Sequence, residues 1–444
     1  MAIKKFTYGQ IWQIAYPILV SALMEQLVGI TDAAFLGRVG EVELGASAIG
    51  ATFYIAIFMI GLGFSTGAQI LMGRRNGEGN YPAVGTIFHH SLAFLLLLAT
   101  VLAVLTTTLA PSLLRHIVSS EAVGTAAVGY LRWRVFGFFF AYVAIMFRSF
   151  YIATTNTRML TFNSVVMVTS NILFNYILIF GKCGLPAFGI AGAAMGSVLA
   201  EGVSMLFFIV YTCRHTDYRK YGLDRRPQFK GHLLGRILGI SVWTMIQDFI
   251  SLSTWFIFFL AIEHLGEREL AVTNVIRNIS SVFFMTVIAL SSTATTLVSN
   301  LMGQGEADSV LPMLRRTIRL GFFLLTPVLL LTALFNESVL ALFTNETALI
   351  EAGRAPLFVL IGSYALTIPA QIYFHAVSGT GNTRMALCFE FASLLVYMIF
   401  VGVVIFSMRA SLAVCWMSEY VYSVMAIAFS WTYMRYGRWR NKQI

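Results

Sequence analysis

The sequence predicts an all-α integral membrane protein with twelve membrane-spanning helices in two six-helix bundles. Composition, continuous apolar runs and an internal repeat support this prediction. Of the 444 residues, 58% are hydrophobic and only 11% are charged. A soluble chain of this length carries about 25% charged residues, because water must wet its surface. The composition therefore excludes an ordinary soluble protein and predicts a surface that contacts lipid.

Twelve apolar runs are long enough for a helix to cross the hydrocarbon core, which takes about 20 residues. The runs are continuous, whereas the strands of a membrane barrel alternate over about ten residues. They lie near residues 11–37, 46–72, 85–110, 128–150, 160–181, 188–213, 235–262, 270–300, 316–336, 352–378, 385–407 and 411–434. The first run shows no cleavage pattern, so we expect a permanent span and not a signal peptide.

The distribution of positive charge predicts the orientation. Most of the 30 Lys and Arg residues fall in the connections on the side of the N-terminus. Cytoplasmic connections retain positive charge, so both termini are expected in the cytoplasm, with the chain in a bacterial inner membrane. This placement explains the net charge of +10, and nucleic acid is not an expected partner. The four cysteines show no CxxC spacing, so no thiolate metal site or disulfide framework is predicted.

Three short motifs recur 226 residues apart. GEVEL at 40–44 returns as GEREL at 266–270, GEG at 77–79 as GQG at 303–305, and NTRM at 156–159 as NTRM at 382–385. We therefore expect two lobes, 1–213 and 235–444, joined by a basic cytoplasmic linker, 214–234. Six spans per repeat give both lobes the same orientation, related by a pseudo-two-fold axis along the membrane normal. A cavity near the midplane and alternating access are the expected consequence.

Buried carboxylates are the main functional candidates, because an ionised one at mid-bilayer costs about 2.5 to 3.5 kcal/mol and usually faces a cavity or a partner. Asp32 lies in the first span, and Glu25 lies two helical turns earlier on nearly the same face. These two side chains could line one wall of a cavity; a purely structural hydrogen-bonding role is the alternative for each. Seven acids fall in or near the spans: Glu25, Asp32, Glu201, Asp248, Glu263, Glu390 and Glu419.

The fifth predicted span carries two amides. Asn171 and Asn175 are four residues apart, so both emerge on one face of a helix. Their carbonyl oxygens suit a hard cation. Interhelical hydrogen bonding is the alternative interpretation of the same pair.

Several of these patterns resemble one family. Pro17 in the first span, Asp32 within TDAAFLGRVG, NILFNYILIFG in the fifth span and the GIAGAAMGS that follows it resemble the multidrug and toxic compound extrusion (MATE) family. The resemblance covers nearly the whole chain. Within the family it is greatest to the DNA-damage-inducible F proteins.

The resemblance implies a secondary antiporter that exports cationic, lipophilic compounds in exchange for H⁺ or Na⁺. By motif position, Asp32, Asn171, Asn175 and Ser197 match the cation site of the amino-terminal lobe, with Na⁺ a possible ligand of the first three. Pro17 matches a proline at which the first helix bends. Some members carry an acid where Asn175 stands, so the coupling ion is left open between H⁺ and Na⁺. No other cofactor is expected.

The second half departs from this pattern. Another branch of the family uses an acid in the seventh helix, but the repeat maps Glu25 onto Ser251, and Asp248 lies about one turn away. Asp248 is therefore a further candidate cavity acid. We expect the ion site to be concentrated in the first lobe.

Two alternatives remain. A lipid-linked oligosaccharide flippase of the same superfamily should place Arg or Lys in its cavity, whereas this chain places acids in its spans. A membrane-embedded enzyme needs a nucleophile with a base or a metal motif, and no HExxH motif is present. We therefore expect a monomeric transporter of small organic cations, in contact with membrane lipid, and not an enzyme.

Overall fold

The computed structural model describes residues 6–118, 120–224, 230–442 and 444, and within them the chain forms helices and turns without strands. Among these residues, eleven helices are long and apolar enough to cross a membrane, and the count is twelve when one bent helix pair is taken as a single span. The chain is a multi-pass membrane protein, as the sequence predicted.

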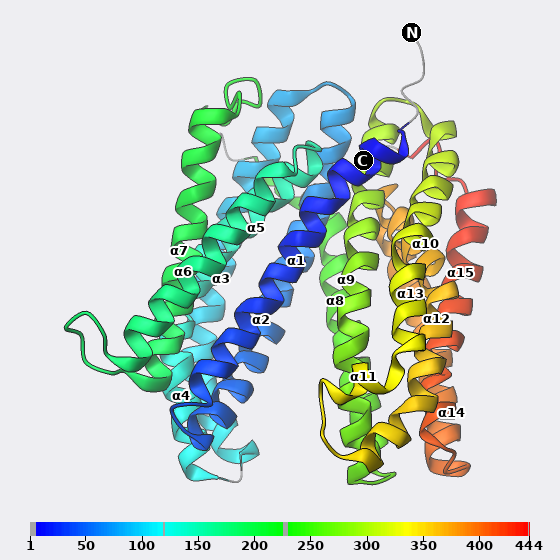
Figure 1. Cartoon of the computed structure of the whole chain (residues 1–444). Helices are drawn as coiled ribbons and strands as arrows, with labels where there is room; N and C mark the ends of the chain where they lie inside the picture. The colour runs from blue at the N-terminus through cyan, green and yellow to red at the C-terminus, as the bar shows by residue number, and fades with distance from the viewer. Residues whose placement is uncertain (1–5, 119, 225–229, 443) are drawn as a thin grey trace. The chain divides into compact units, whose positions relative to one another are not determined.

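The chain divides into two compact units, which we call the N-terminal unit (residues 20–245) and the C-terminal unit (residues 1–19 and 246–444). The N-terminal unit contains most of α1 (Tyr8–Leu36), α2 (Glu41–Gly77), α3 (Tyr81–Ile117), α4 (Glu121–Arg134), α5 (Gly137–Ala153), α6 (Arg158–Phe180), α7 (Gly189–His215) and the first part of α8 (Gly231–Glu263). These helices run from blue to green in Figure 1.

The C-terminal unit repeats this order of long helices. It contains the rest of α8, α9 (Glu267–Gly303), the short 3₁₀ turn η1 (Ala307–Ser309), α10 (Val310–Leu334), α11 (Asn336–Ala341), α12 (Thr347–Gly379), α13 (Thr383–Gly402), the π-helical turn η2 (Val403–Ser407), α14 (Leu412–Trp416) and α15 (Ser418–Tyr436). Within this unit, α12 packs against both α9 and α15.

The two units do not coincide with the predicted lobes 1–213 and 235–444. The first part of α1 belongs to the C-terminal unit, and the first part of α8 belongs to the N-terminal unit. The division falls at Val20 in α1 and at Ile246 in α8. These positions are 226 residues apart, which is the spacing of the sequence repeat. Both repeats therefore contribute the start of their first helix to the other unit.

The repeated motifs mark the ends of helices. GEVEL and GEREL begin α2 and α9, and each places two glutamates in the first helical turn, where the helix dipole favours negative charge. GEG and GQG end the same two helices, with Gly79 at φ 72° and Gly305 at φ 75°, a left-handed conformation that glycine adopts without strain. The two NTRM motifs lie at the start of α6 and α13. The repeat is thus a repeat of helix boundaries.

The fourth span is broken. Helix α4 ends at Arg134 and α5 begins at Gly137, and the two helices are bent by 53°. The sequence predicted one continuous span at 128–150, because the apolar run there is long enough for a single helix to cross the membrane. The break brings the polar end of α4 into the interior of the N-terminal unit.

The described part of the predicted linker packs against the first half of α3 and forms a hydrogen bond with it. The backbone N–H of Lys230 donates to His90 Nε2 at 2.8 Å, while His90 Nδ1 contacts the carbonyl of Thr86 at 2.8 Å. Gly85 approaches the Tyr221 carbonyl so closely that a Cβ would collide with it. Residues 225–229 of the linker lie outside the described part of the chain.

Candidate cation site

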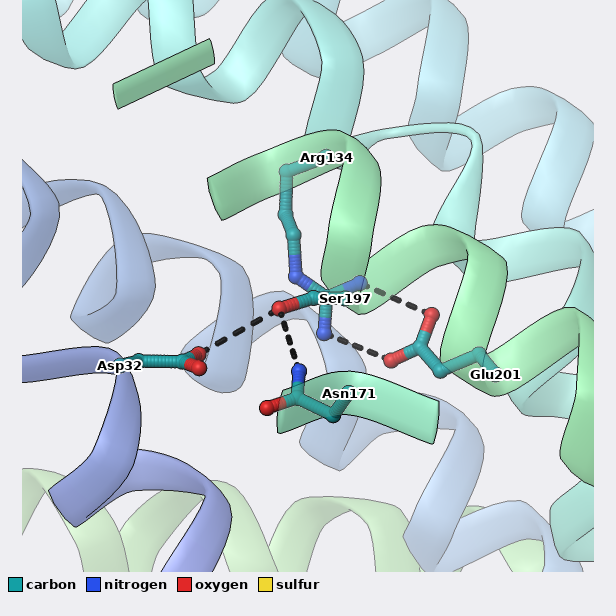
Figure 2. A network of polar contacts seen from close by, with 5 residues as sticks. All are labelled: Asp32, Arg134, Asn171, Ser197 and Glu201. Atoms are coloured by element: carbon teal, nitrogen blue, oxygen red, sulfur yellow. Dashed lines mark hydrogen bonds and ion pairs between the residues drawn. The ribbon is translucent and has the colours of Figure 1, made fainter. Parts of the chain in front are cut away.

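Four side chains from three helices form a closed ring of hydrogen bonds in the N-terminal unit. Asn175 Nδ2 donates to Asp32 Oδ1 at 2.5 Å and to Asn171 Oδ1 at 3.2 Å. Asn171 Nδ2 donates to Ser197 Oγ at 3.2 Å, and Ser197 Oγ donates to Asp32 Oδ2 at 3.3 Å. Figure 2 shows Ser197 between Asp32 and Asn171. The structure therefore brings together the four residues predicted for cation coupling.

Local sequence explains this assembly. The spacing of Asn171 and Asn175 places both amides on one face of α6. Helix α7 packs closely against α6, because Gly192 and Gly196 lie where a Cβ would meet α6 atoms. In Figure 1, α6 and α7 run side by side in green. The small residues of GIAGAAMGS thus bring Ser197 within reach of the amides.

The amides of the ring are fully buried, whereas its carboxylate is not. Asn175 is 0% exposed and Asn171 is 1% exposed, while Asp32 is half-buried. Both Asp32 oxygens accept a hydrogen bond, an arrangement that suits the ionised carboxylate because charge-assisted hydrogen bonds are the stronger ones. The ring therefore presents one negative charge, supported by neutral donors.

One oxygen in the ring is unused. Asn175 Oδ1 is buried and has no hydrogen-bond partner among the described residues. A buried acceptor without a partner costs about 1 to 3 kcal/mol, so this atom is available to a water molecule or a bound ion. Carboxylate, amide and hydroxyl oxygens together are the donor set that hard cations prefer. The residues present therefore fit Na⁺, and the carboxylate alone fits a proton.

A second charged pair lies next to this ring. Arg134, at the end of α4, donates to Glu201 on α7 through its two terminal guanidinium nitrogens, Nη1 at 2.8 Å and Nη2 at 2.6 Å. Glu201 follows Ser197 by one helical turn. The sequence indicated Glu201 among seven acids but not Arg134, because an ion pair between residues 67 positions apart leaves no local pattern. The break after Arg134 also carried no sequence signal.

Glu25 is not part of the ring. Its carboxylate forms an ion pair with Arg148 on α5 at 2.6 Å, and its side chain is 48% exposed. No contact joins Glu25 and Asp32 among the described residues, and a wall shared by these two side chains stays a prediction. Pro17 lies buried within α1, three residues before the division between the units.

The C-terminal unit contains a separate buried carboxylate. Glu390 on α13 is 3% exposed and accepts hydrogen bonds from Ser251 at 2.6 Å and from Tyr422 at 2.8 Å. Ser251 is the repeat equivalent of Glu25. Asp248, the predicted candidate, is half-buried on α8, one turn before Ser251. The sequence named Glu390 and Asp248, but it did not indicate the two hydroxyl partners.

Comparisons with known proteins agree with this architecture. A family model described as MatE matches the chain twice, over residues 17–177 and 244–404. The chain belongs to the MatE family. The two matches start at corresponding points of α1 and α8, one residue away from the spacing of the motifs, so the family model matches each repeat once.

Relatives and solved structures extend the match over most of the chain. The probable multidrug resistance protein NorM of Thermotoga maritima is 25% identical over 386 residues, which is 86% of this chain and 82% of NorM. The multidrug resistance protein MdtK of Pectobacterium atrosepticum is 24% identical over 379 residues, covering 84% of this chain and 80% of MdtK. A MOP superfamily transporter from Pyrococcus furiosus has the same fold, with a TM-score of 0.88, 18% identity and 100% of both chains covered. The MatE protein described here is a membrane transporter and not an enzyme.

Proposed function

We propose that this chain is a secondary active antiporter that exports cationic lipophilic compounds in exchange for H⁺ or Na⁺, by alternating access. The observation that supports this proposal is the closed ring around Asp32, in which neutral donors hold a single carboxylate. The names of NorM and MdtK, which are multidrug resistance proteins, support the substrate class. The coupling ion is itself the second substrate, and no other cofactor is proposed.

Charge competition is the proposed mechanism. When Asp32 is ionised, the ring carries one negative charge, which favours the binding of a lipophilic cation in the N-terminal lobe. When Asp32 takes up H⁺, or when Na⁺ is bound by the ring oxygens, this charge is neutralised and the organic cation loses its main electrostatic attraction. The binding of each cation then lowers the affinity of the site for the other, and this reciprocal coupling lets the gradient of the coupling ion drive export.

The aromatic composition suits varied substrates. Phe, Tyr and Trp make up 14% of the chain, and there are 19 methionines. Aromatic faces attract organic cations, and methionine adapts its shape to different ligands. We further propose a monomer in the bacterial inner membrane with both termini in the cytoplasm, on the basis of the positive charge of the predicted inner connections.

Reconstitution tests the proposal. The purified protein in liposomes should move a lipophilic cation such as ethidium when a pH gradient or a Na⁺ gradient, each imposed alone, drives the exchange. The gradient that drives efflux identifies the coupling ion. Asp32→Asn should abolish the effect of that gradient, because the neutral amide has no charge that one cation could neutralise in place of another. Efflux and ion coupling that both survive Asp32→Asn would refute the assigned role of Asp32.

The flippase alternative predicts a different result in the same liposomes. It requires a positive cavity that holds the pyrophosphate of a lipid-linked sugar. Arg134 is the positive charge beside the ring, and Glu201 neutralises it, so this site does not favour an anionic head group. Movement of lipid-linked pyrophosphate without movement of ethidium would support the flippase and contradict the antiporter.

A further inference from the structure

The ion pair between Arg134 and Glu201 has no role in the exchange described above, although it lies one helical turn from the ring. We propose that Glu201 is a positioning residue for the cation site. From α7, its carboxylate binds the guanidinium of Arg134 and so keeps this positive side chain away from Asp32. The Asp32 carboxylate then stays open to an exogenous cation. This inference rests on the proposed function of Asp32.

The geometry of the pair is specific. Two parallel hydrogen bonds of 2.8 Å and 2.6 Å join the guanidinium to the carboxylate, and the two side chains are 12% and 15% exposed. Tyr54 on α2 supports the guanidinium from one face, with its ring centroid 3.8 Å away. A bidentate pair of this kind fixes the direction of an arginine, whereas a lysine would contribute only a point charge.

The backbone is built around this pair. Gly137, the first residue of α5, packs so closely that a Cβ would collide with the Arg134 guanidinium and the Glu201 carboxylate. The ring of Tyr54 also stacks on Phe138 of α5 at 4.6 Å. The end of α4, the start of α5 and one face of α7 therefore meet at the pair. The bend between α4 and α5 is what delivers Arg134 to this position.

Arg134 is also an electrostatic neighbour of the site. Its charge acts on the Asp32 carboxylate, and Glu201 shares a helix face with Ser197, which donates to Asp32. Figure 2 shows Ser197 between Asp32 and the ion pair. In this poorly hydrated interior a cation without a partner is costly, so it pairs with the nearest anion. Without Glu201, that anion is Asp32.

Four variants of the full-length protein test this inference. The binding constant of tetraphenylphosphonium is measured by titration calorimetry in detergent at one fixed pH, and the thermal midpoint of each variant is measured in parallel. Glu201→Gln frees Arg134 and should weaken binding about tenfold or more, since the freed cation competes for Asp32. The double variant Arg134→Gln/Glu201→Gln contains neither charge and should bind within about threefold of the wild type, because the competing cation is gone.

Two further variants serve as controls. Glu78→Gln removes the partner of Arg75 in an exposed ion pair at the end of α2 and should leave the binding constant unchanged. Asp32→Asn, made in the otherwise unchanged protein, removes the carboxylate itself and should weaken binding.

The outcomes separate the two proposals. Recovery of binding in the double variant supports the positioning role, because a merely structural role would leave the double variant as weak as Glu201→Gln. Weakened binding in Asp32→Asn together with unchanged binding in Glu201→Gln overturns this inference alone. Unchanged binding in Asp32→Asn, or no binding by the wild type, counts against the proposed function.

Discussion

Asn175 donates a hydrogen bond of 2.5 Å to Asp32, while its own carbonyl oxygen accepts none from the described residues. One side chain therefore both supports the charge of the site and offers an unused ligand atom. This combination distinguishes the ring from ordinary hydrogen bonding between helices, which would satisfy both ends of a buried amide.

Asn175→Asp should tighten the binding of the coupling ion. Two carboxylates at hydrogen-bond distance cannot both stay charged unless a proton or a metal cation lies between them. We expect the apparent affinity for the coupling ion to rise by at least about tenfold, which corresponds to about 1.4 kcal/mol. Ion-dependent efflux from liposomes, measured over a series of ion concentrations, checks this. Asn175→Ala is the matched control and should weaken ion binding, so a tighter site in the alanine variant would contradict the interpretation.

Alanine substitutions at the glycines of α7 should differ in their effects on stability and on ion coupling. At Gly192 a Cβ would lie 2.6 Å from the Leu178 backbone, so Gly192→Ala should destabilise the protein by about 1 to 3 kcal/mol or more, because backbone atoms cannot move aside. Gly196→Ala would push against the Asn175 amide and should impair ion coupling more than stability. Thermal unfolding in detergent, together with efflux, separates the two effects.

Gly202→Ala is the control for this series. The nearest atoms to its Cβ belong to Phe140 at 3.9 Å, which is an ordinary contact. Alanine should therefore stabilise α7 by about 0.5 to 1 kcal/mol relative to glycine. Equal losses of stability at all three positions would mean that α6 and α7 do not pack as described.

Gly137→Ala tests whether the start of α5 packs closely against Arg134 and Glu201. The added methyl group would displace the guanidinium or the carboxylate of the buried pair, at a cost of about 1 to 3 kcal/mol. Gly129→Ala on α4 meets no atom within 4 Å and should be neutral or slightly stabilising. The difference between the two thermal midpoints is the measurement. If both glycines tolerate alanine equally, α5 does not approach Arg134 and Glu201 as closely as described.

The Glu390 cluster should stabilise the C-terminal unit without setting the ion dependence. Tyr422→Phe and Ser251→Ala each remove a hydroxyl that donates to a buried carboxylate, and each should cost about 1 to 3 kcal/mol. Thermal unfolding checks the cost, and efflux under an ion gradient checks the coupling. A changed ion dependence in either variant would instead identify Glu390 as part of a second ion site.

Helix positions were the most predictable feature, because each span needs a long apolar run in lipid. The predicted spans 46–72 and 270–300 fall inside α2 and α9, and both observed helices extend a few residues further at each end. The break in the predicted span 128–150 was not found. At the break, Gly137 lies close to Arg134 of the same segment and to Glu201 of α7, and a contact with a distant helix leaves no periodic pattern in the segment itself.

The candidate site was predictable to the extent that its residues share a helix face. Asn171 and Asn175 were paired by spacing alone, and their contacts with Asp32 and Ser197 followed from the family resemblance. Glu25 shows the limit of the spacing argument, since its face on α1 was right for Asp32 but its charge is taken by Arg148. A partner on another helix decides such cases, and a single sequence does not identify that partner.

The divisions at Val20 and Ile246 mean that neither repeat is self-sufficient. A polypeptide that contained one repeat alone would lack the first half-helix that its compact unit takes from the other repeat. Two identical copies could supply this half-helix to each other by exchanging these segments. The reciprocal exchange in the present chain is therefore what duplication and fusion of such an interlocked homodimer would leave behind.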